Sequence, residues 1–254
     1  SARLAKVAEA DLTFLCLPDE AAKELVAQAP ETAKICDTST AHRVNASWVY
    51  GFAELTGQRE KIKTANRVAV PGCHATGYIA LVRPLIEKGL LAADCPLSCH
   101  SLTGYSGGGK AMIEEYEADI RAEKYDAPRA YGLSLTHKHL PEMQALTGAQ
   151  QPPIFTPVVA DYYSGMLVTV SIPLSALQAV KSGEQIAKML ADYYQGAPLI
   201  QVHPFAQLPE DGMLDANALS GKDNLEIFIY GNATQLLLVA RFDNLGKGAS
   251  GAAI

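Results

Sequence analysis

The sequence predicts a parallel α/β segment followed by an α+β domain that is built on a mixed, largely antiparallel sheet. Two observations support this fold class. In the first seventy residues, short apolar runs of strand length alternate with helical spacing, as in parallel α/β proteins. Beyond residue 95, longer β-prone runs follow one another with few helices between them, which is typical of an α+β domain.

The first seventy residues begin with a strand-to-helix unit. Residues 11–17, DLTFLCL, are apolar and of strand length, and the next stretch, PDEAAKELVAQA, has the apolar spacing of a helix. A second short strand is predicted at 33–36, and it ends at the loop 37–43, DTSTAHR. Open α/β sheets present polar loops at the ends of their strands, so we expect this loop to be functional.

One helix is predicted over residues 72–89, with Gly89 as its stop and Pro84 as a kink or break. The β-prone runs beyond it are 97–103, 131–136, 154–160, 166–174, 225–230 and 235–242, and two helices interrupt them near 110–120 and 183–194. This pattern predicts the mixed sheet of the second domain.

The composition narrows the classes of function. With 254 residues, 48% of them apolar and 19% charged, the chain is expected to fold around a substantial core. A formal charge of −6 without any Lys/Arg-rich run argues against a nucleic-acid partner. No apolar stretch approaches the roughly 20 residues of a membrane-spanning helix. No signal peptide pattern opens the chain, so a cytoplasmic location is expected.

The segment 101–111, SLTGYSGGGKA, resembles a phosphate-binding loop. It misses the G-x-x-x-x-G-K-[ST] pattern only at Ala111, which lacks the hydroxyl that would bind magnesium. Glycines followed by a helix still present backbone N–H groups to an anion, so the loop can hold a phosphate without hydrolysing a nucleotide. The alternative is a flexible turn before an amphipathic helix.

Cys73 is the candidate nucleophile. It follows Pro71 and Gly72 where a turn becomes a helix, and a helix N-terminus lowers the pKa of a thiol. The five cysteines include no C-x-x-C pair, so the other four are expected to be free thiols. The alternative for Cys73 is a small apolar residue at the start of a helix.

His137 and His139, in LTHKHLPEM, are candidates for the acid/base group. They lie two residues apart after a strand-like run, so their side chains should share a face, and an imidazole can exchange a proton at neutral pH. A metal site would need a third ligand of suitable spacing, and we predict no metal. Two surface histidines are the remaining alternative. Arg43 and Lys110 are candidate anion binders, or solvated surface charges.

Six ordered motifs together resemble the N-acetyl-γ-glutamyl-phosphate reductase family in its shorter-chain form. They are DTSTAHR, VPGCHATG, SLTGYSGGGKA, YGLSLTHKHLPEM, FTPVVADYYSGMLVTV and DNLGKGASGAA. The family is similar in fold to aspartate-semialdehyde dehydrogenase. The resemblance implies the remainder of a Rossmann-type NADP-binding domain at 1–70, a catalytic domain at 71–240 and the start of a returning C-terminal helix at 241–254.

The resemblance also implies an activity and a set of roles. The reaction is the NADPH-dependent reduction of an acyl phosphate in arginine biosynthesis, with Cys73 forming a thioester and His137 or His139 acting as the acid/base group. The implied substrate contacts are Arg43, Ser106 and Lys110, and the implied NADP(H) contacts are Pro18, Ser39, Gly107, Asn244 and Gly246. A homo-oligomer, dimer or tetramer, is expected.

The sequence departs from the family pattern in three places, one of which is the stretch 231–238, GNATQLLL, which is shorter than the corresponding stretch of the family. The glycine motif that holds the cofactor pyrophosphate is absent, so we expect residues to be missing at the N-terminus, and Val70 replaces the usual Asn. Three other activities stay open. They are a related semialdehyde dehydrogenase that uses another acyl phosphate, a cofactor-free cysteine hydrolase or acyltransferase, and, with least support, a P-loop phosphotransferase. A binding module without activity is the fourth alternative.

Overall fold

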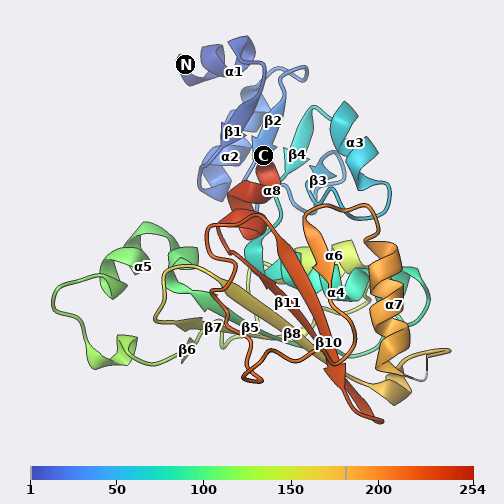
Figure 1. The fold of residues 1–254 in the computed structure, drawn as a ribbon. Helices are drawn as coiled ribbons and strands as arrows, with labels where there is room; N and C mark the ends of the chain where they lie inside the picture. Colours follow the sequence, from blue (N-terminus) through green and yellow to red (C-terminus); the bar gives the residue numbers. More distant parts are fainter. Residues whose placement is uncertain (1, 181) are drawn as a thin grey trace.

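The computed structural model describes residues 2–180 and 182–254, and in these residues the chain forms two sheets (Figure 1). The first sheet has four strands in the order β1-β2-β4-β3, and the second has seven in the order β6-β7-β5-β8-β11-β10-β9. All neighbours in the first sheet run parallel, whereas the second sheet is mixed and largely antiparallel. The predicted fold class is therefore confirmed.

The N-terminal sheet and its helices cover residues 2–69. Their bounds are α1 Ala2–Glu9, β1 Thr13–Leu15, α2 Asp19–Gln28, β2 Ile35–Asp37, β3 Val49–Tyr50, α3 Gln58–Thr64 and β4 Arg67–Ala69. The predicted strand-helix-strand unit is confirmed as β1, α2 and β2. A small core of Val7, Leu15, Ala33 and Ile35 holds this layer together.

Helix α4, Cys73–Glu87, is the central helix of the molecule and packs on β8 and β11. Gly77 allows this close approach, because a Cβ atom there would lie 2.5 Å from Cγ2 of Val168. The helix runs on through Pro84 without ending, and Gly89 follows it with φ at +67°, as expected of a stop. Packing on both sides of α4 holds the helix together despite the missing N–H group of the proline.

The second sheet and its helices make up most of the rest. Their bounds are β5 Ser98–Gly104, α5 Gly109–Tyr116, β6 Arg129–Ala130, α6 Leu140–Thr147, β7 Ile154–Ala160, β8 Met166–Pro173, α7 Gly183–Tyr193, β9 Ile200–Val202, β10 Leu225–Gly231, β11 Gln235–Phe242 and α8 Gly251–Ala253. The strand predicted at 131–136 is wrong. Gly132 and Leu135 have φ values of +63° and +58°, which an extended strand excludes, and only the two residues of β6 pair with β7.

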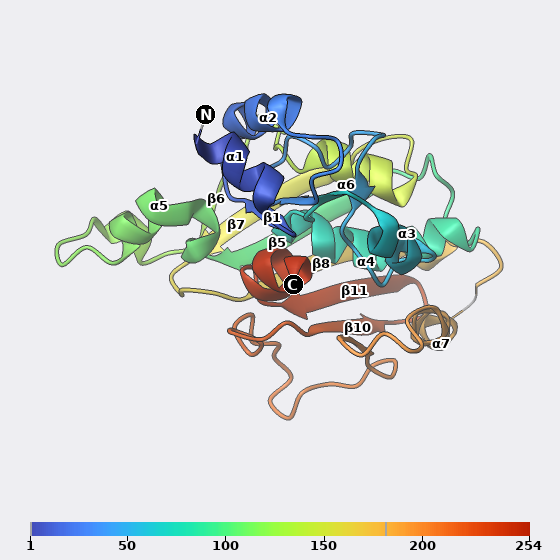
Figure 2. The ribbon, with the colours of Figure 1, turned by 90° about the horizontal axis from the view of Figure 1, so that it is seen from above.

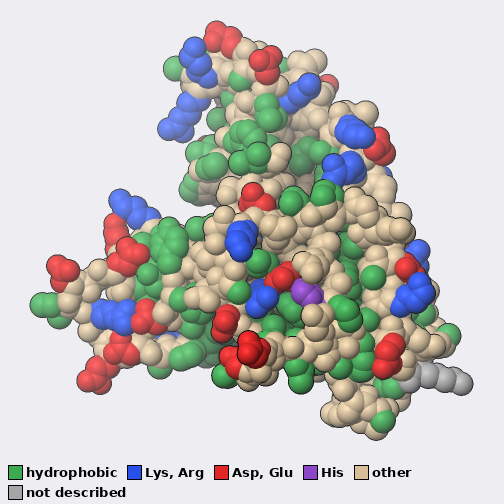
Figure 3. All heavy atoms as spheres, viewed as in Figure 1, with side chains coloured by type: hydrophobic (Ala, Val, Ile, Leu, Met, Phe, Trp, Pro, Cys, Tyr) green, Lys and Arg blue, Asp and Glu red, His purple; other side chains and the backbone are tan. Residues whose placement is uncertain are grey.

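Helices α4 and α6 lie between the two sheets, and the short C-terminal helix α8 lies against the first sheet (Figure 1). The segment that carries α5 projects from the body in both views (Figure 1, Figure 2). Charged side chains of both signs cover this projection, among them the ion pairs Lys110–Glu114 and Arg121–Asp126 (Figure 3). Within the described residues, no helix is both long enough and apolar enough to span a membrane.

Candidate active site

A pocket lies where the ends of the two sheets meet, and six chain segments line it. The lining residues are Thr38 and Arg43 after β2; Val70, Pro71, Cys73 and His74 around the start of α4; Thr103 and Gly104 at the end of β5, with Ser106–Gly109 and Met112 after it; Tyr131, His137, Lys138 and His139 before α6; Val159 of β7; and Asn244, Leu245, Gly248 and Ala249 near the C-terminus. Three of these segments follow β2, β4 and β5, so the pocket lies at strand ends, where ligands bind in α/β proteins.

Cys73 is the first residue of α4, and its half-buried side chain faces this pocket. The expectation of a lowered pKa is wrong, because burial raises the pKa of the thiol above its usual value. The Arg43 guanidinium, the backbone N–H of His74 and the charge of Lys138 oppose this effect without cancelling it. A base must therefore take the thiol proton before Cys73 can act as a nucleophile.

The C-terminal segment closes one side of Cys73. A Cβ atom on Gly248 would lie 2.9 Å from Cβ of Cys73, so glycine is required for this approach. The sequence analysis missed Gly248, although its G-K-G-A-S setting after β11 was part of the family resemblance.

His139 is buried at the start of α6, and its Nδ1 atom has no hydrogen-bond partner among the residues that the structure describes. Burial holds the pKa of His139 well below its usual value, so the imidazole is neutral at pH 7 and can accept a proton. The backbone N–H of His139 donates to Nδ1 of His137 at 3.2 Å, and the two rings lie 4.8 Å apart between centroids. The histidines are close because of this turn and not because of a strand.

His74, next to the nucleophile, is a third histidine of the site, and the sequence analysis missed it. Its ring centroid lies 5.5 Å from those of both His137 and His139. Its ring nitrogens are 2.7 Å from Oγ of Ser101 and 2.6 Å from the hydroxyl of Tyr131. Burial lowers the pKa of His74 to about 3 and that of His137 to about 4.

Arg43 connects the N-terminal layer to the pocket. Its Nη1 donates to Oε1 of Glu142 at 2.7 Å, and its Nε donates to the carbonyl of Val70 at 2.9 Å. Nη2 donates to the carbonyl of Thr38 at 3.1 Å. A guanidinium has five N–H groups, so two remain for an anionic ligand in the pocket that Arg43 lines.

Glu142, which the sequence analysis also missed, is the buried partner of Arg43. It accepts hydrogen bonds from the hydroxyl of Tyr50 at 2.9 Å and from the backbone N–H of Gly72 at 3.1 Å. Burial raises the pKa of Glu142, and the Arg43 guanidinium is the strongest opposing influence. Glu142 follows His139 by one helical turn, and this spacing was the available signal. The carboxylate thereby holds the turn that precedes Cys73.

Ser106, Gly107 and Asn244 also line the pocket, and two of them are joined by a hydrogen bond. Nδ2 of Asn244 donates to Oγ of Ser106 at 3.0 Å, and Oδ1 of Asn244 accepts the N–H of Gly165 at 2.9 Å. A Cβ atom on Gly107 would lie 3.5 Å from the Asn244 amide, which is ordinary contact. These buried polar groups hold the glycine loop in place along the pocket.

Comparison with known proteins places this site in a family. Residues 1–65 match the signature described as "Semialdehyde dehydrogenase, NAD binding domain", and residues 73–244 match "Semialdehyde dehydrogenase, dimerisation domain". The chain is 47% identical to N-acetyl-gamma-glutamyl-phosphate reductase 2 of a Nostoc species, over 96% of this chain and 79% of that protein. It is 46% identical to N-acetyl-gamma-glutamyl-phosphate reductase of Brucella anthropi, over 96% and 81%.

The chain belongs to the N-acetyl-gamma-glutamyl-phosphate reductase family. The resemblance found in the motifs is thus confirmed. In fold, the chain is similar to aspartate semialdehyde dehydrogenase from Francisella tularensis, with a TM-score of 0.74, 13% identity and coverage of 98% of this chain and 81% of that one. Aspartate semialdehyde dehydrogenase II from Vibrio cholerae gives a TM-score of 0.71 at 17% identity, over 95% and 76%.

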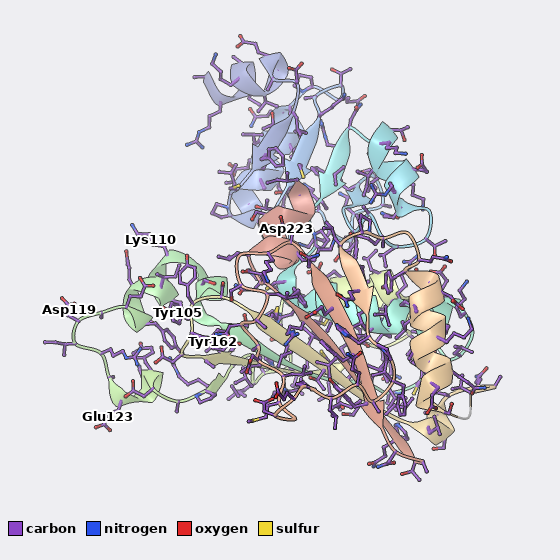
Figure 4. The ribbon with its side chains drawn as sticks, in the orientation of Figure 1. Tyr105, Lys110, Asp119, Glu123, Tyr162 and Asp223 are labelled. Carbon is purple, nitrogen blue, oxygen red and sulfur yellow. The ribbon has the colours of Figure 1, made fainter. Side chains whose placement is uncertain are left out.

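Four residues that the family resemblance implied lie outside the lining of the pocket. Pro18 is exposed before α2, and Ser39 is buried, with its hydroxyl 2.7 Å from Oδ2 of Asp37. Gly246 packs against the backbone carbonyl of Lys222. Lys110 is exposed on α5 and points away from the body (Figure 4). The pocket instead contains Lys138, an exposed cation that the sequence analysis did not select.

Within residues 2–180 and 182–254, no group of three or more His, Cys, Asp or Glu side chains could hold a metal ion. The three histidines contact one another through their rings and not around a common point.

The buried histidines should make the stability of this family member depend on pH. The unfolded chain binds a proton to each histidine near pH 6.5, whereas folded His74 and His137 bind one only near pH 3 and pH 4. The stability that these neutral histidines contribute is therefore fully present above about pH 6.5. It is lost progressively as the pH falls from about 6.5 toward the pKa values of the folded state. The lowered pKa of His74 alone should make the free energy of unfolding about 2 kcal/mol smaller at pH 5 than at pH 7.

Urea unfolding at pH 7 and pH 5 measures this effect. His74→Gln should reduce the difference between the two free energies of unfolding, whereas the exposed His100→Gln should leave it unchanged. An unchanged difference in His74→Gln would contradict the assignment of His74 as a buried neutral group.

Proposed function

We propose that this chain catalyses the NADPH-dependent reductive dephosphorylation of N-acetyl-γ-glutamyl phosphate to N-acetylglutamate 5-semialdehyde, a step of arginine biosynthesis. The observation that supports this most is that Cys73, His139 and Arg43 line one pocket, in which His139 is neutral and its Nδ1 atom has no hydrogen-bond partner among the described residues. A nucleophile, a base and an anion binder are what acyl transfer from an acyl phosphate requires. The relatives that bear the reductase name support the substrate.

The first half of the reaction uses the chain's own residues. His139 accepts the proton of the Cys73 thiol, because its imidazole is neutral and its Nδ1 atom is free of other partners. Cys73 Sγ then bonds to the acyl carbon, and the C–O bond to the phosphate breaks, which leaves a thioester and inorganic phosphate. NADPH, when bound, supplies a hydride to reduce the acyl group. The C–S bond then breaks to release the aldehyde, and His139 returns the proton to Sγ of Cys73.

The pocket offers places for both anionic partners. The two remaining N–H groups of Arg43 and the exposed ammonium of Lys138 suit the phosphate or the carboxylate of the substrate. Gly107 and Asn244 would hold the nicotinamide end of the cofactor, because both line the pocket that contains Cys73. Ser39 and Pro18 follow β2 and β1, on the side where the rest of the cofactor would extend.

Several finer assignments stay predictions. A preference for NADP(H) over NAD goes beyond the match to an NAD binding domain. The match of residues 73–244 to a dimerisation domain supports a homo-oligomer, dimer or tetramer. The boundaries 1–70, 71–240 and 241–254, the roles of Lys110 and Gly246, and a cytoplasmic location likewise stay predictions.

The reverse reaction of the full-length protein tests the proposal. NADP, inorganic phosphate and N-acetylglutamate 5-semialdehyde should produce NADPH, whereas aspartate semialdehyde should produce little, and omission of phosphate should stop the reaction. Equal rates with aspartate semialdehyde would favour a related dehydrogenase. NADPH formation that does not need phosphate would contradict the acyl-phosphate route. No NADPH formation with either semialdehyde would contradict the reductase itself and favour cofactor-free cysteine chemistry.

A further inference from the structure

A chain of hydrogen bonds runs from the second sheet into the pocket, and the mechanism above does not use it. Ser101 lies on β5, His74 on α4 and Tyr131 in the turn before α6. Nδ1 of His74 is 2.7 Å from Oγ of Ser101, and Nε2 of His74 is 2.6 Å from the hydroxyl of Tyr131. Both distances are those of good hydrogen bonds.

The donor and the acceptor in each of these two hydrogen bonds follow from which protons need an acceptor. Ser101 is completely buried, and among the described residues His74 is the only hydrogen-bond partner of its hydroxyl group. A buried O–H left without an acceptor is costly, so the Ser101 hydroxyl donates to Nδ1 of His74. His74 is neutral, and its single N–H is therefore on Nε2, where it donates to the oxygen of Tyr131.

With these directions, the hydroxyl proton of Tyr131 is not used in its hydrogen bond to His74. The oxygen of Tyr131 accepts from His74, so its own O–H is available as a donor. Tyr131 is half-buried and lines the same pocket as Cys73. Burial and the negative charge of a Cys73 thiolate both raise the pKa of Tyr131, so the phenol keeps its proton during catalysis. The pocket thus has a neutral donor near the nucleophile.

We propose that Tyr131 donates a hydrogen bond to the acyl oxygen that becomes negative when Cys73 attacks, and that Ser101 and His74 hold Tyr131 in this donor state. Tyr131 is thereby a catalytic residue, and His74 is a positioning residue. The identity of the acyl group rests on the proposed function, whereas the role of Tyr131 requires only acyl transfer to Cys73. Donors aimed at a developing oxyanion contribute more to the transition state than to substrate binding.

Tyr131→Phe removes the donor and little else. In the reverse reaction it should lower kcat by about 10²-fold while KM for the semialdehyde changes by less than about threefold. Tyr105→Phe is the matched control, because its hydroxyl contacts Glu117 on the projecting segment, outside the pocket. A loss of less than about threefold in kcat, or a loss confined to KM, overturns the proposal.

Variants of His74 test the positioning role. His74→Phe keeps a ring but loses the N–H donor, and it should approach the kcat of Tyr131→Phe. His74→Gln keeps a donor amide and should recover most of the activity. In the double variant His74→Phe/Tyr131→Phe the two losses should not multiply, because both remove the same hydrogen bond to the substrate. Losses that multiply would show that His74 acts apart from Tyr131.

A second assay separates this proposal from the proposed function. p-Nitrophenyl acetate needs no cofactor: Cys73 Sγ bonds to its acetyl carbon, and p-nitrophenolate leaves with the C–O bonding electrons. Tyr131→Phe should slow this release about as much as it lowers kcat, and Cys73→Ser should abolish it. If turnover of the semialdehyde is absent while acylation depends on Tyr131, the proposed function fails and the role of Tyr131 stands. Acylation that is independent of Tyr131 overturns that role.

Discussion

Replacing Cys73 with serine should lower turnover of N-acetylglutamate 5-semialdehyde by at least about 10³-fold, because the covalent route then depends on an alkoxide. Burial already raises the pKa of the Cys73 thiol, so the site relies on His139 to remove that proton. A serine hydroxyl is much less acidic, and a histidine with a lowered pKa is a poor base toward it. The loss should appear in kcat, measured as phosphate-dependent NADPH formation.

The matched control for this variant is Cys16→Ser. Cys16 is exposed and does not line the pocket, so its replacement should leave turnover unchanged. The free energy of unfolding of Cys73→Ser should stay close to that of the parent, because sulfur and oxygen differ little in volume at this half-buried position. Substantial turnover by folded Cys73→Ser would exclude a thioester mechanism.

Arg43→Leu should destabilise the protein by about 3–5 kcal/mol and also impair catalysis. The side chains of Arg43 and Glu142 are 8% and 2% exposed, so the variant leaves a buried carboxylate without its cation. The guanidinium also donates to the carbonyl of Val70 near Cys73. We therefore expect a raised KM for phosphate in the reverse reaction. Urea unfolding at neutral pH measures the loss of stability.

Two further variants make this test specific. Lys63→Leu breaks the exposed ion pair with Glu60 and should leave stability nearly unchanged. Arg43→Leu/Glu142→Gln removes the unpaired charge and should recover part of the lost stability without recovering activity. If Arg43→Leu is as stable as the parent, the buried pair does not hold the two parts of the molecule together.

Local patterns in the sequence were sufficient to predict many of the strands and helices of the fold. The apolar runs at 154–160 and 235–242 match β7 and β11, because strands of this length bury alternate residues and show this in their composition. The run at 131–136 was misjudged, since Gly132 and Leu135 turn the chain there. Short elements such as β3 and β9 were not predicted, because two or three residues carry too little periodicity.

By itself, the sequence determined which cysteine lies at the start of the central helix and two of the three histidines that share its pocket. Cys73 follows a Pro-Gly turn at a helix start, and His137 and His139 share a motif, so local order was enough to select them. The ordered motifs also determined the family, which the comparisons confirm.

Only the tertiary structure decided the electrostatics of the site and its remaining members. Burial, which depends on every segment packed around Cys73, outweighs the helix N-terminus and raises the pKa of the thiol. Glu142 pairs with Arg43, and Tyr131 contacts His74, in each case across a large distance in sequence, while Lys110 lies outside the pocket. Contacts between distant segments leave no local pattern, so the sequence could not reveal them.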